Sequence, residues 1–204
     1  GFCVILGSEQ GRLAYELARR SSLRIYGVEP DAAKARAARK ALDRAGLHGS
    51  RITILHADPS EMPVSNFFAN LVVSDSLVRH GSMPVKNDGW TRIVKPCGGV
   101  VCFAVPAEAA RQHGLTQEKV TATLAGIGME ATQTQLKLFP EKDGLLATLT
   151  RGKLPGAGEW SHQYGNVANT LTSDDHRLKG GLGILWYGDP GPSQMVNRHE
   201  GASA

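Results

Sequence analysis

The stretch that decides the fold is Phe2–Arg20, FCVILGSEQGRLAYELARR. An apolar run over residues 2–6 is followed by Gly7-Ser-Glu-Gln-Gly11, and residues 11–20 then place Leu and Ala at helical spacing. A buried strand, a glycine turn and an amphipathic helix in this order are typical of the start of a parallel β-α-β unit. Glycine at such a turn lets the backbone come close to a ligand. We therefore expect an α/β domain with a ligand site above its first strand.

The alternation of strands and helices continues to about residue 150. A capping Asp31 and a closing Gly46 bound the strongest helix pattern. The predicted fold class is a doubly wound, mostly parallel, seven-stranded α/β sheet with a C-terminal antiparallel hairpin and an irregular tail. Further strands are predicted at residues 23–29, 51–58, 69–75 and 100–105, helices at 31–46, 90–95 and 116–127, and a hairpin at 132–151 that turns at Asp143 and Gly144.

Length and composition bound the domain organisation. The chain has 204 residues, of which 41% are hydrophobic and 21% charged, enough for one domain with a sizeable core and some additional chain. From residue 153 the sequence becomes rich in Gly, Pro, Asn and Asp without helical or strand periodicity. We predict a domain over residues 1–152 and a connector over 153–204 that is too short for a second domain. Because the first residue is Gly, we expect an internal piece of a longer protein.

The charge pattern argues against a nucleic-acid partner. The net charge is +4 and the pI about 9.1, but no aromatic residues interleave with the basic ones, which favours solvated helix faces. No apolar run reaches the roughly 20 residues of a membrane span. The basic residues that we assign to solvated faces include Arg19, Arg20, Lys34, Arg36, Arg39, Lys40 and Arg44.

The cysteines and histidines predict neither disulfide bonds nor a metal site. The three cysteines, Cys3, Cys97 and Cys102, lack paired spacing, so we expect buried or incidental thiols and no disulfide framework. His162, His176 and His199 are far apart and have no ligand pattern, so no metal site is predicted. The cysteine usage weakly favours the cytoplasm, although the compartment stays open.

Three consecutive predicted strands end on carboxylates, Glu29, Asp58 and Asp75. In a doubly wound sheet the carboxyl ends of the strands lie at one edge, so these acids should converge with the turn at residues 7–11. A carboxylate after the second strand can accept hydrogen bonds from both ribose hydroxyls, which indicates a nucleoside site. The alternative is strand-end acids that face water. Asp75 and His80 could form an acid/base pair, although a surface role for His80 is the commoner case.

At these residues the sequence resembles the class I S-adenosylmethionine (SAM) dependent methyltransferases. "CVILGSEQGRLAYELARR" is similar to the first motif of that family, "YGVEPD" to the second, "LHADPSEMP" to the third, "ANLVVSD" to the fourth strand, and "WTRIVKPCGGVVCFAVP" to the segment that leads into the fifth. The resemblance implies SAM as cofactor, with Glu29 on its ribose and Asp58 on its adenine. The cofactor-binding residues that it implies are Gly7, Glu9, Gly11, Glu29, Pro30, Ala57, Asp58, Ser74 and Asp75, and its candidates for catalysis are Asp75 and His80.

The first motif departs from the family pattern at two positions. Ile5 stands where the family has an acid, and Glu9 stands at the middle glycine. A side chain at residue 9 would crowd the ligand or strain a backbone that prefers positive φ, at a cost of about 1–3 kcal/mol. Alternatively, Glu9 supplies the missing acid toward the ligand's ammonium or sulfonium. A nicotinamide site competes less well, because "GSEQGR" lacks the close glycine pair of that fingerprint.

The tail resembles the segment that leads into β-propeller repeats of the pyrroloquinoline-quinone (PQQ) type, which implies that residues 153–204 are a connector or the truncated first blade of a propeller. The resemblance also implies a covalently linked propeller and leaves export open. The function predicted from the whole chain is methyl transfer from SAM to an unknown acceptor with a degenerate first motif. The alternative is a non-catalytic scaffold of the same fold, attached to the propeller and serving binding or interaction. A blocked pocket at Glu9 favours the scaffold, and an open cleft that reaches Asp75 favours the enzyme.

Overall fold

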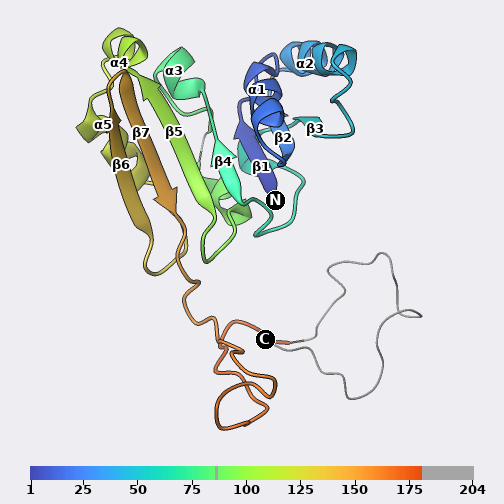
Figure 1. Ribbon diagram of the computed structural model, residues 1–204, viewed down its shortest axis with the longest axis vertical. Coiled ribbons are helices and arrows are strands. Elements are labelled where there is room, and N and C mark those ends of the chain that lie inside the picture. The colour runs from blue at the N-terminus through green and yellow to red at the C-terminus, as the bar shows by residue number, and fades with distance from the viewer. Residues whose placement is uncertain (86, 181–204) are drawn as a thin grey trace. The chain divides into compact units, whose positions relative to one another are not determined.

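The computed structural model describes residues 1–85 and 87–180. Seven strands form one sheet in the order β3-β2-β1-β4-β5-β7-β6 (Figure 1). Strands β1 to β5 are parallel to one another, whereas β7 runs antiparallel to both β5 and β6. This confirms the predicted doubly wound sheet with its C-terminal hairpin. The strands are β1 Phe2–Leu6, β2 Arg24–Glu29, β3 Ile52–His56, β4 Leu71–Val73, β5 Val100–Pro106, β6 Gln135–Glu141 and β7 Gly144–Thr150.

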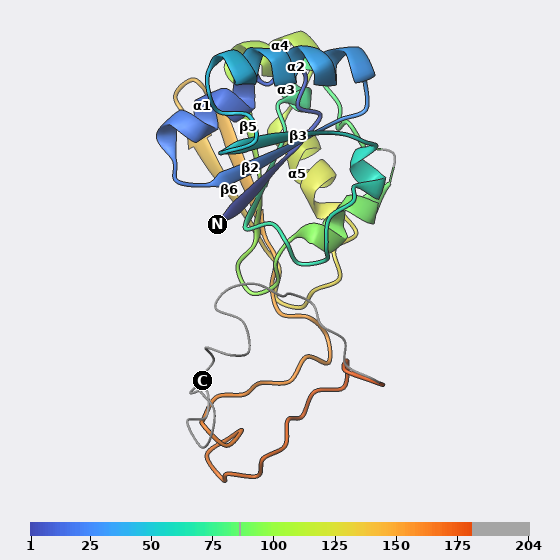
Figure 2. The same ribbon diagram turned by 90° about the vertical axis from the view of Figure 1, so that its right-hand side faces the viewer.

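Helices cover the two faces of the sheet unequally. One face carries α1 and α2, and α5 lies on the other (Figure 2). Asp31 caps α2 as predicted, because its carboxylate accepts from the backbone N–H groups of Ala33 and Lys34 at 2.7 and 3.0 Å. The helical elements are α1 Arg12–Arg20, α2 Ala32–Arg44, α3 Ser76–His80, α4 Ala107–His113, α5 Gln117–Ala125 and the 3₁₀ turns η1 Pro59–Glu61 and η2 Asp88–Ile93.

Several helical segments differ from the sequence prediction. Helix α3 after β4 and the 3₁₀ turn η1 after β3 were not predicted. The α-helix expected at residues 90–95 is the 3₁₀ turn η2, which Asn87 caps and which ends at Ile93, ahead of Pro96. Helix α4 follows β5 directly and was not predicted. It ends at Gly114, whose φ of +58° closes the helix in the left-handed conformation.

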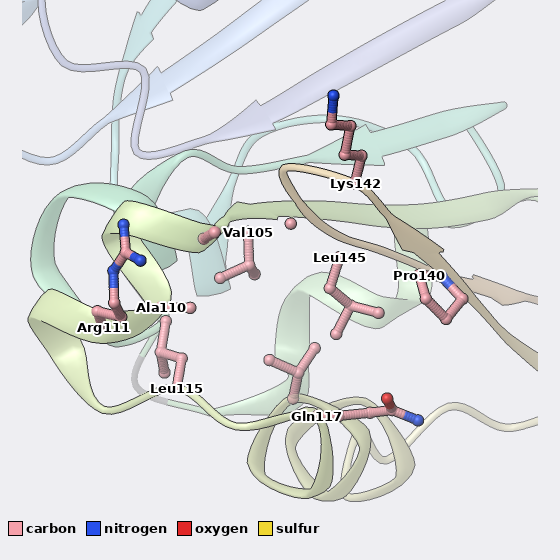
Figure 3. Close-up of a pocket in the computed structure, with 11 residues that line it drawn as sticks. Val105, Ala110, Arg111, Leu115, Gln117, Pro140, Lys142 and Leu145 are labelled. Atoms are coloured by element: carbon pink, nitrogen blue, oxygen red, sulfur yellow. The ribbon is translucent and has the colours of Figure 1, made fainter.

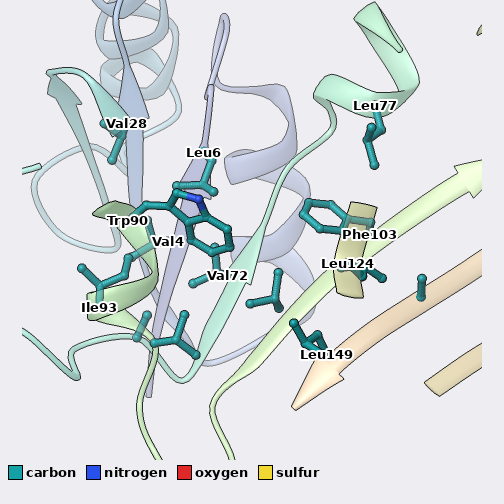
Figure 4. Close-up of a cluster of buried hydrophobic side chains, with 14 of the residues drawn as sticks. Val4, Leu6, Val28, Val72, Leu77, Trp90, Ile93, Phe103, Leu124 and Leu149 are labelled. Atoms are coloured by element: carbon teal, nitrogen blue, oxygen red, sulfur yellow. The ribbon is translucent and has the colours of Figure 1, made fainter. Parts of the chain in front are cut away.

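Each face of the sheet has its own hydrophobic core. Trp90 from η2 is 1% exposed and packs against Val4, Leu6 and Val72 of the central strands (Figure 4). The opposite core is smaller and joins β1 to the alanines of α1 and α2. Because alanine side chains are small, the backbones of both helices pack close to β1 and β2. The start of α2 therefore lies beside the turn after β1.

A glycine-rich turn precedes β5 and is bonded to the residues that follow β7. In Pro96-Cys97-Gly98-Gly99 the N–H groups of Cys97 and Gly98 donate to the carbonyls of Gly152 and Arg151, both at 3.0 Å. Arg151 is 2% exposed, and its guanidinium donates to the backbone carbonyls of residues 91, 94 and 130. Cys97 has a φ of +56°. Backbone hydrogen bonds and one buried cation therefore tie β5 to the end of β7.

The chain divides into two units, with the boundary after Leu154. Residues 155–180 of the second unit contain turns and one isolated bridge, between His162 and Gly165, and no helix or strand. Apolar side chains remain exposed there, including Trp160 at 48%. The predicted PQQ-like blade is not shown, and His199 lies outside the described residues. The other exposed large apolar side chains of this segment are Tyr164, Val167, Leu171 and Leu178.

The remaining composition-based expectations concern thiols, metals and membranes. Burial raises the pKa of the Cys3 thiol to about 12, and all three cysteines are free. Within residues 1–85 and 87–180, no cluster of three His, Cys, Asp or Glu side chains could hold a metal ion. In the same ranges no helix combines the length and the apolar character that crossing a bilayer requires.

Candidate nucleoside site

The turn after β1 depends on its two glycines. Gly7 and Gly11 have φ values of +70° and +85°, which side chains rarely adopt. The N–H groups of Gly7 and Ser8 both donate to the carbonyl of Val28, at 2.9 and 3.0 Å, so the turn lies against the end of β2. A Cβ atom at Gly7 would lie 3.0 Å from Pro84 and from the Ser76 hydroxyl. The segment after β4 therefore closes directly over the first turn.

Glu29 is the buried acid of this site. It ends β2 and is 3% exposed. Its Oε1 accepts from the N–H of Asp31 at 3.0 Å, and its Oε2 accepts from the N–H of Glu9 at 2.6 Å. A carboxylate has about four acceptor positions, so two remain for a ligand. The carboxylate thus joins the first turn to the start of α2.

Glu9 occupies the turn in an unusual conformation. It is the middle residue between the two glycines and has a φ of +49°, a region that costs a non-glycine residue free energy. Its Oε2 lies 2.7 Å from Nζ of Lys34, and its Oε1 lies 3.0 Å from Nε2 of His80. The Glu9 side chain therefore connects α2 to α3, and only 17% of it is exposed.

Electrostatics favour the ionised form of Glu9. Burial raises the pKa of Glu9, but the hydrogen bonds from Lys34 and His80 outweigh it, so the pKa lies below its ordinary value of 4.5. The same hydrogen bond raises the pKa of Lys34 above its ordinary value. Arg79 adds a weaker attraction from α3. Glu9 is consequently charged at neutral pH and held at both oxygens.

The end of β4 contributes two further polar residues. The Ser74 hydroxyl donates to the carbonyl of Leu6 at 2.6 Å, which joins β4 to β1 at the same edge. Asp75 Oδ2 accepts from Nε of Arg79 at 2.6 Å. Asp75 Oδ1 is buried and has no hydrogen-bond partner among the described residues. The acid/base pair considered for Asp75 and His80 is not formed in this structure, because Asp75 binds Arg79 and His80 binds Glu9.

The end of β3 lies beside Glu29. The N–H of Ala57 donates to the carbonyl of Glu29 at 3.2 Å. The strand ends at His56 rather than at Asp58, whose Oδ1 caps η1 by accepting from the N–H of Ser60 at 2.9 Å. Pro30 is exposed, and its carbonyl contacts His56 at 3.2 Å. The structure therefore brings the implied residues from the first four strands to one edge, although their roles in binding stay predictions.

Two residues of this site were not found from the sequence. We assigned Lys34 to a solvated helix face, but it is half-buried and paired with Glu9. Its position three residues after the capping Asp31, in the first turn of α2, was the available signal. Ser8 is 3% exposed, packs in the space that Gly27 leaves free, and has a hydroxyl without a hydrogen-bond partner among the described residues.

A separate cavity lies at the end of β5. It has a volume of about 330 Å³ and is enclosed by α4, the start of α5 and the hairpin (Figure 3). Apolar walls come from Val105, Ala110, Leu115 and Leu145, and Arg111 and Lys142 stand at its rim. Helix α4 contacts α3 through His113, which lies 3.1 Å from the carbonyl of Val78. None of the described residues that line the cavity belongs to the turn at residues 7–11 or to α3.

The residues present fit an adenosyl ligand in part. Glu29 retains acceptor capacity for two ribose hydroxyls, and the unpaired Asp75 Oδ1 offers an acceptor to an ammonium group. Against this, the Glu9 carboxylate lies within the site and Glu29 is almost inaccessible. The hydrogen-bond acceptors therefore match the donors of the ligand, while the space for the ligand depends on the position of Glu9.

Comparisons with known proteins agree with this geometry. The profile of the family described as "Methyltransferase domain" matches residues 4–102. A search of curated protein sequences gives no match to the chain.

Solved structures share the fold at low sequence identity. A SAM-dependent methyltransferase from Methanococcus maripaludis has a TM-score of 0.58 and 22% identity, over 75% of this chain and 78% of that one. One from Aquifex aeolicus has a TM-score of 0.53 and 11% identity, over 73% and 80%. The [4+2]-cyclase SpnF has a TM-score of 0.51 and 12% identity, over 75% of each chain. Residues 4–102 therefore match the methyltransferase domain family, and the chain has the class I methyltransferase fold.

Proposed function

We propose that this chain is a SAM-binding, methyltransferase-like domain. The observation that carries the proposal is the buried carboxylate of Glu29, which lies at the end of β2 and accepts a hydrogen bond from the glycine turn after β1. In this fold that is where an acid meets a ribose. The match of residues 4–102 to the methyltransferase family supports the same assignment.

Each residue of the site has a role in this proposal. Glu29 holds the ribose, Asp58 the adenine, and the free oxygen of Asp75 attracts the ammonium of the amino-acid part. SAM supplies an electrophilic methyl group when it is bound. The chain contributes position and the exclusion of water rather than covalent chemistry, and an acceptor bound near Ser74 and Asp75 would attack in line. The acceptor is not identified by these residues.

A second candidate is a non-catalytic scaffold of the same fold. It is favoured by Glu9, whose side chain crosses the site, and by Pro84, which lies against Gly7. The SpnF cyclase shows that this fold serves reactions other than the one its family name suggests. A propeller attached after residue 154 remains part of both proposals, and the exposed apolar side chains of residues 155–180 suit a segment that packs in a larger assembly.

Ligand-induced stabilisation separates the two candidates. At 100 times its dissociation constant a ligand adds roughly 2.7 kcal/mol to folding, so millimolar SAM or S-adenosylhomocysteine should raise Tm by about 5–10 °C. Glu29→Ala should remove the shift. Asp175→Ala, which changes a loop of the second unit, should preserve it. Cooperative melting without any shift in the unaltered protein would favour the scaffold.

A further inference from the structure

Glu9 joins three elements at the entrance to Glu29. Its backbone N–H donates to Glu29, and its two carboxylate oxygens contact Lys34 of α2 and His80 of α3. The residues are distant in sequence, since 71 positions separate Glu9 from His80. One short side chain thereby ties together the carboxyl ends of β1, β2 and β4, which are the strand ends that an adenosyl ligand would contact.

We propose that Glu9 is an internal latch on the nucleoside site, whose carboxylate takes the place of ligand between Lys34 and His80 and must leave before an adenosyl group can reach Glu29. The proposal rests on the proposed function, because it assumes that the site takes an adenosyl ligand. It adds that binding of the ligand and release of Glu9 are one event.

Accessibility carries the first step of the argument. A ribose hydroxyl must come within about 2.5–3.0 Å of a carboxylate oxygen to bind it. Glu29 is only 3% exposed, so atoms beside it must move first. Glu9 is the residue whose displacement opens the site, since its neighbours Gly7 and Gly11 carry no side chain and Ser8 is buried against Gly27.

The balance of forces makes the latch reversible. The two ion-pair partners are 40% and 52% exposed, and exposed ion pairs contribute little to stability. The positive φ of Glu9 works against the closed state, because a released turn can relax. A latch of this kind lowers the apparent affinity of a ligand by the fraction of molecules that are open, without preventing binding.

Charge determines how the latch responds to solution conditions. The groups that face Glu9 are Lys34 from α2, His80 and Arg79 from α3, and Glu29 from β2. The contact with His80 is an ion pair only when the imidazole is protonated. Acid that protonates Glu9 removes both ion pairs at once, and salt screens them. Ligand affinity at neutral pH should therefore rise with ionic strength in the unaltered protein and not in Glu9→Gln.

Calorimetric titration with S-adenosylhomocysteine tests the proposal. Glu9→Gln, which removes the charge and keeps the size, and Glu9→Gly, which restores the family pattern, should each bind about tenfold more tightly than the unaltered protein. Lys34→Met and His80→Asn should produce smaller gains, because each frees one end of the latch. Glu16→Gln is the matched control: it removes an ion pair with Arg20 on α1 and should leave the affinity unchanged.

A carbon NMR titration of the Glu9 carboxyl gives a second readout. In the free protein the pKa of Glu9 should lie below 4.5. Saturation with S-adenosylhomocysteine should return the pKa toward its ordinary value, because the carboxyl moves into water. Weaker binding by Glu9→Gln would identify Glu9 as a ligand-binding acid and overturn the latch, as would equal affinities with an unchanged titration. Binding by none of the variants would instead overturn the proposed function and the latch with it.

Discussion

Among the turns that place a non-glycine residue in the left-handed conformation, two are stabilised in different ways. Cys97 in the turn at residues 96–99 has a φ of +56°, and Glu9 in the turn at residues 7–11 has a φ of +49°. Backbone hydrogen bonds to the end of β7 hold the first, and the Cys97 side chain is exposed. The second has backbone hydrogen bonds from Gly7 and Ser8 to Val28, and carboxylates add to them through Glu29 and Glu9 itself.

The difference shows which turn a ligand or a proton can move. A turn held by backbone groups and by buried Arg151 responds to unfolding alone. A turn held by carboxylates responds to anything that competes for their charges. The turn at residues 7–11 therefore has the properties of a binding site, whereas the turn at residues 96–99 is part of the scaffold. Four predictions test this contrast, from the largest expected effect to the smallest.

Removal of the buried cation should damage the scaffold turn most. Arg151→Leu leaves the carbonyls of Thr91, Val94 and Glu130 without this donor. Each unpaired buried group costs about 1–3 kcal/mol, so the free energy of unfolding should fall by about 3–5 kcal/mol and Tm by roughly 10 °C. Urea denaturation measures the loss. At a temperature where the variant is folded, its affinity for S-adenosylhomocysteine should be normal, and a loss of affinity would mean that the two turns are coupled.

Substitution of Glu29 should destabilise the protein less than Arg151→Leu does, and it should also abolish ligand binding. Glu29→Ala removes the acceptor of two backbone N–H groups, those of Glu9 and Asp31. We expect unfolding to become about 2 kcal/mol easier and the thermal shift with S-adenosylhomocysteine to disappear. Thermal scans with and without ligand measure both effects. A variant as stable as the unaltered protein would show that these N–H groups find water instead.

The fold was more predictable than the site, and particular residues show why. Hydrophobic runs such as FCVIL and VVCFAV and the cap at Asp31 are local signals, and local signals predicted the strands, α2 and the fold class. The segment at residues 88–93 forms the 3₁₀ turn η2 and not the predicted α-helix. Its short helical pattern did not reveal the effect of the flanking residues Asn87 and Pro96. The pairing of Glu9 with Lys34 and His80 depends on tertiary geometry, since no spacing in the sequence relates these three positions.

Glycine at each strained position should separate the two turns. Cys97→Gly removes the strain of the left-handed conformation and so stabilises the folded protein. Glycine also increases the conformational entropy of the unfolded chain, which offsets part of this effect, so we expect the free energy of unfolding to rise by about 0.5–1 kcal/mol. Ligand affinity should not change. Glu9→Gly relieves the same strain but also loses two ion pairs, so its stability should change less while its affinity rises. If both variants gain equal stability and neither gains affinity, the contacts of Glu9 have no energetic weight.

Acid should distinguish the turns by the smallest effect. The pKa of Glu9 is lowered in the folded protein, so its charge stabilises folding above the pKa of the unfolded chain, about 4.3, and this contribution is lost as the pH falls through the lower folded value. The difference in Tm between the unaltered protein and Glu9→Gln should therefore be present at pH 6 and shrink as the pH falls below about 4.3. The difference caused by Cys97→Gly should stay constant over the same range, because backbone strain does not titrate. Melting curves at intervals of half a pH unit measure both differences. If the Glu9→Gln difference also stays constant, the turn at residues 7–11 is held by its backbone, and the contrast between the two turns fails.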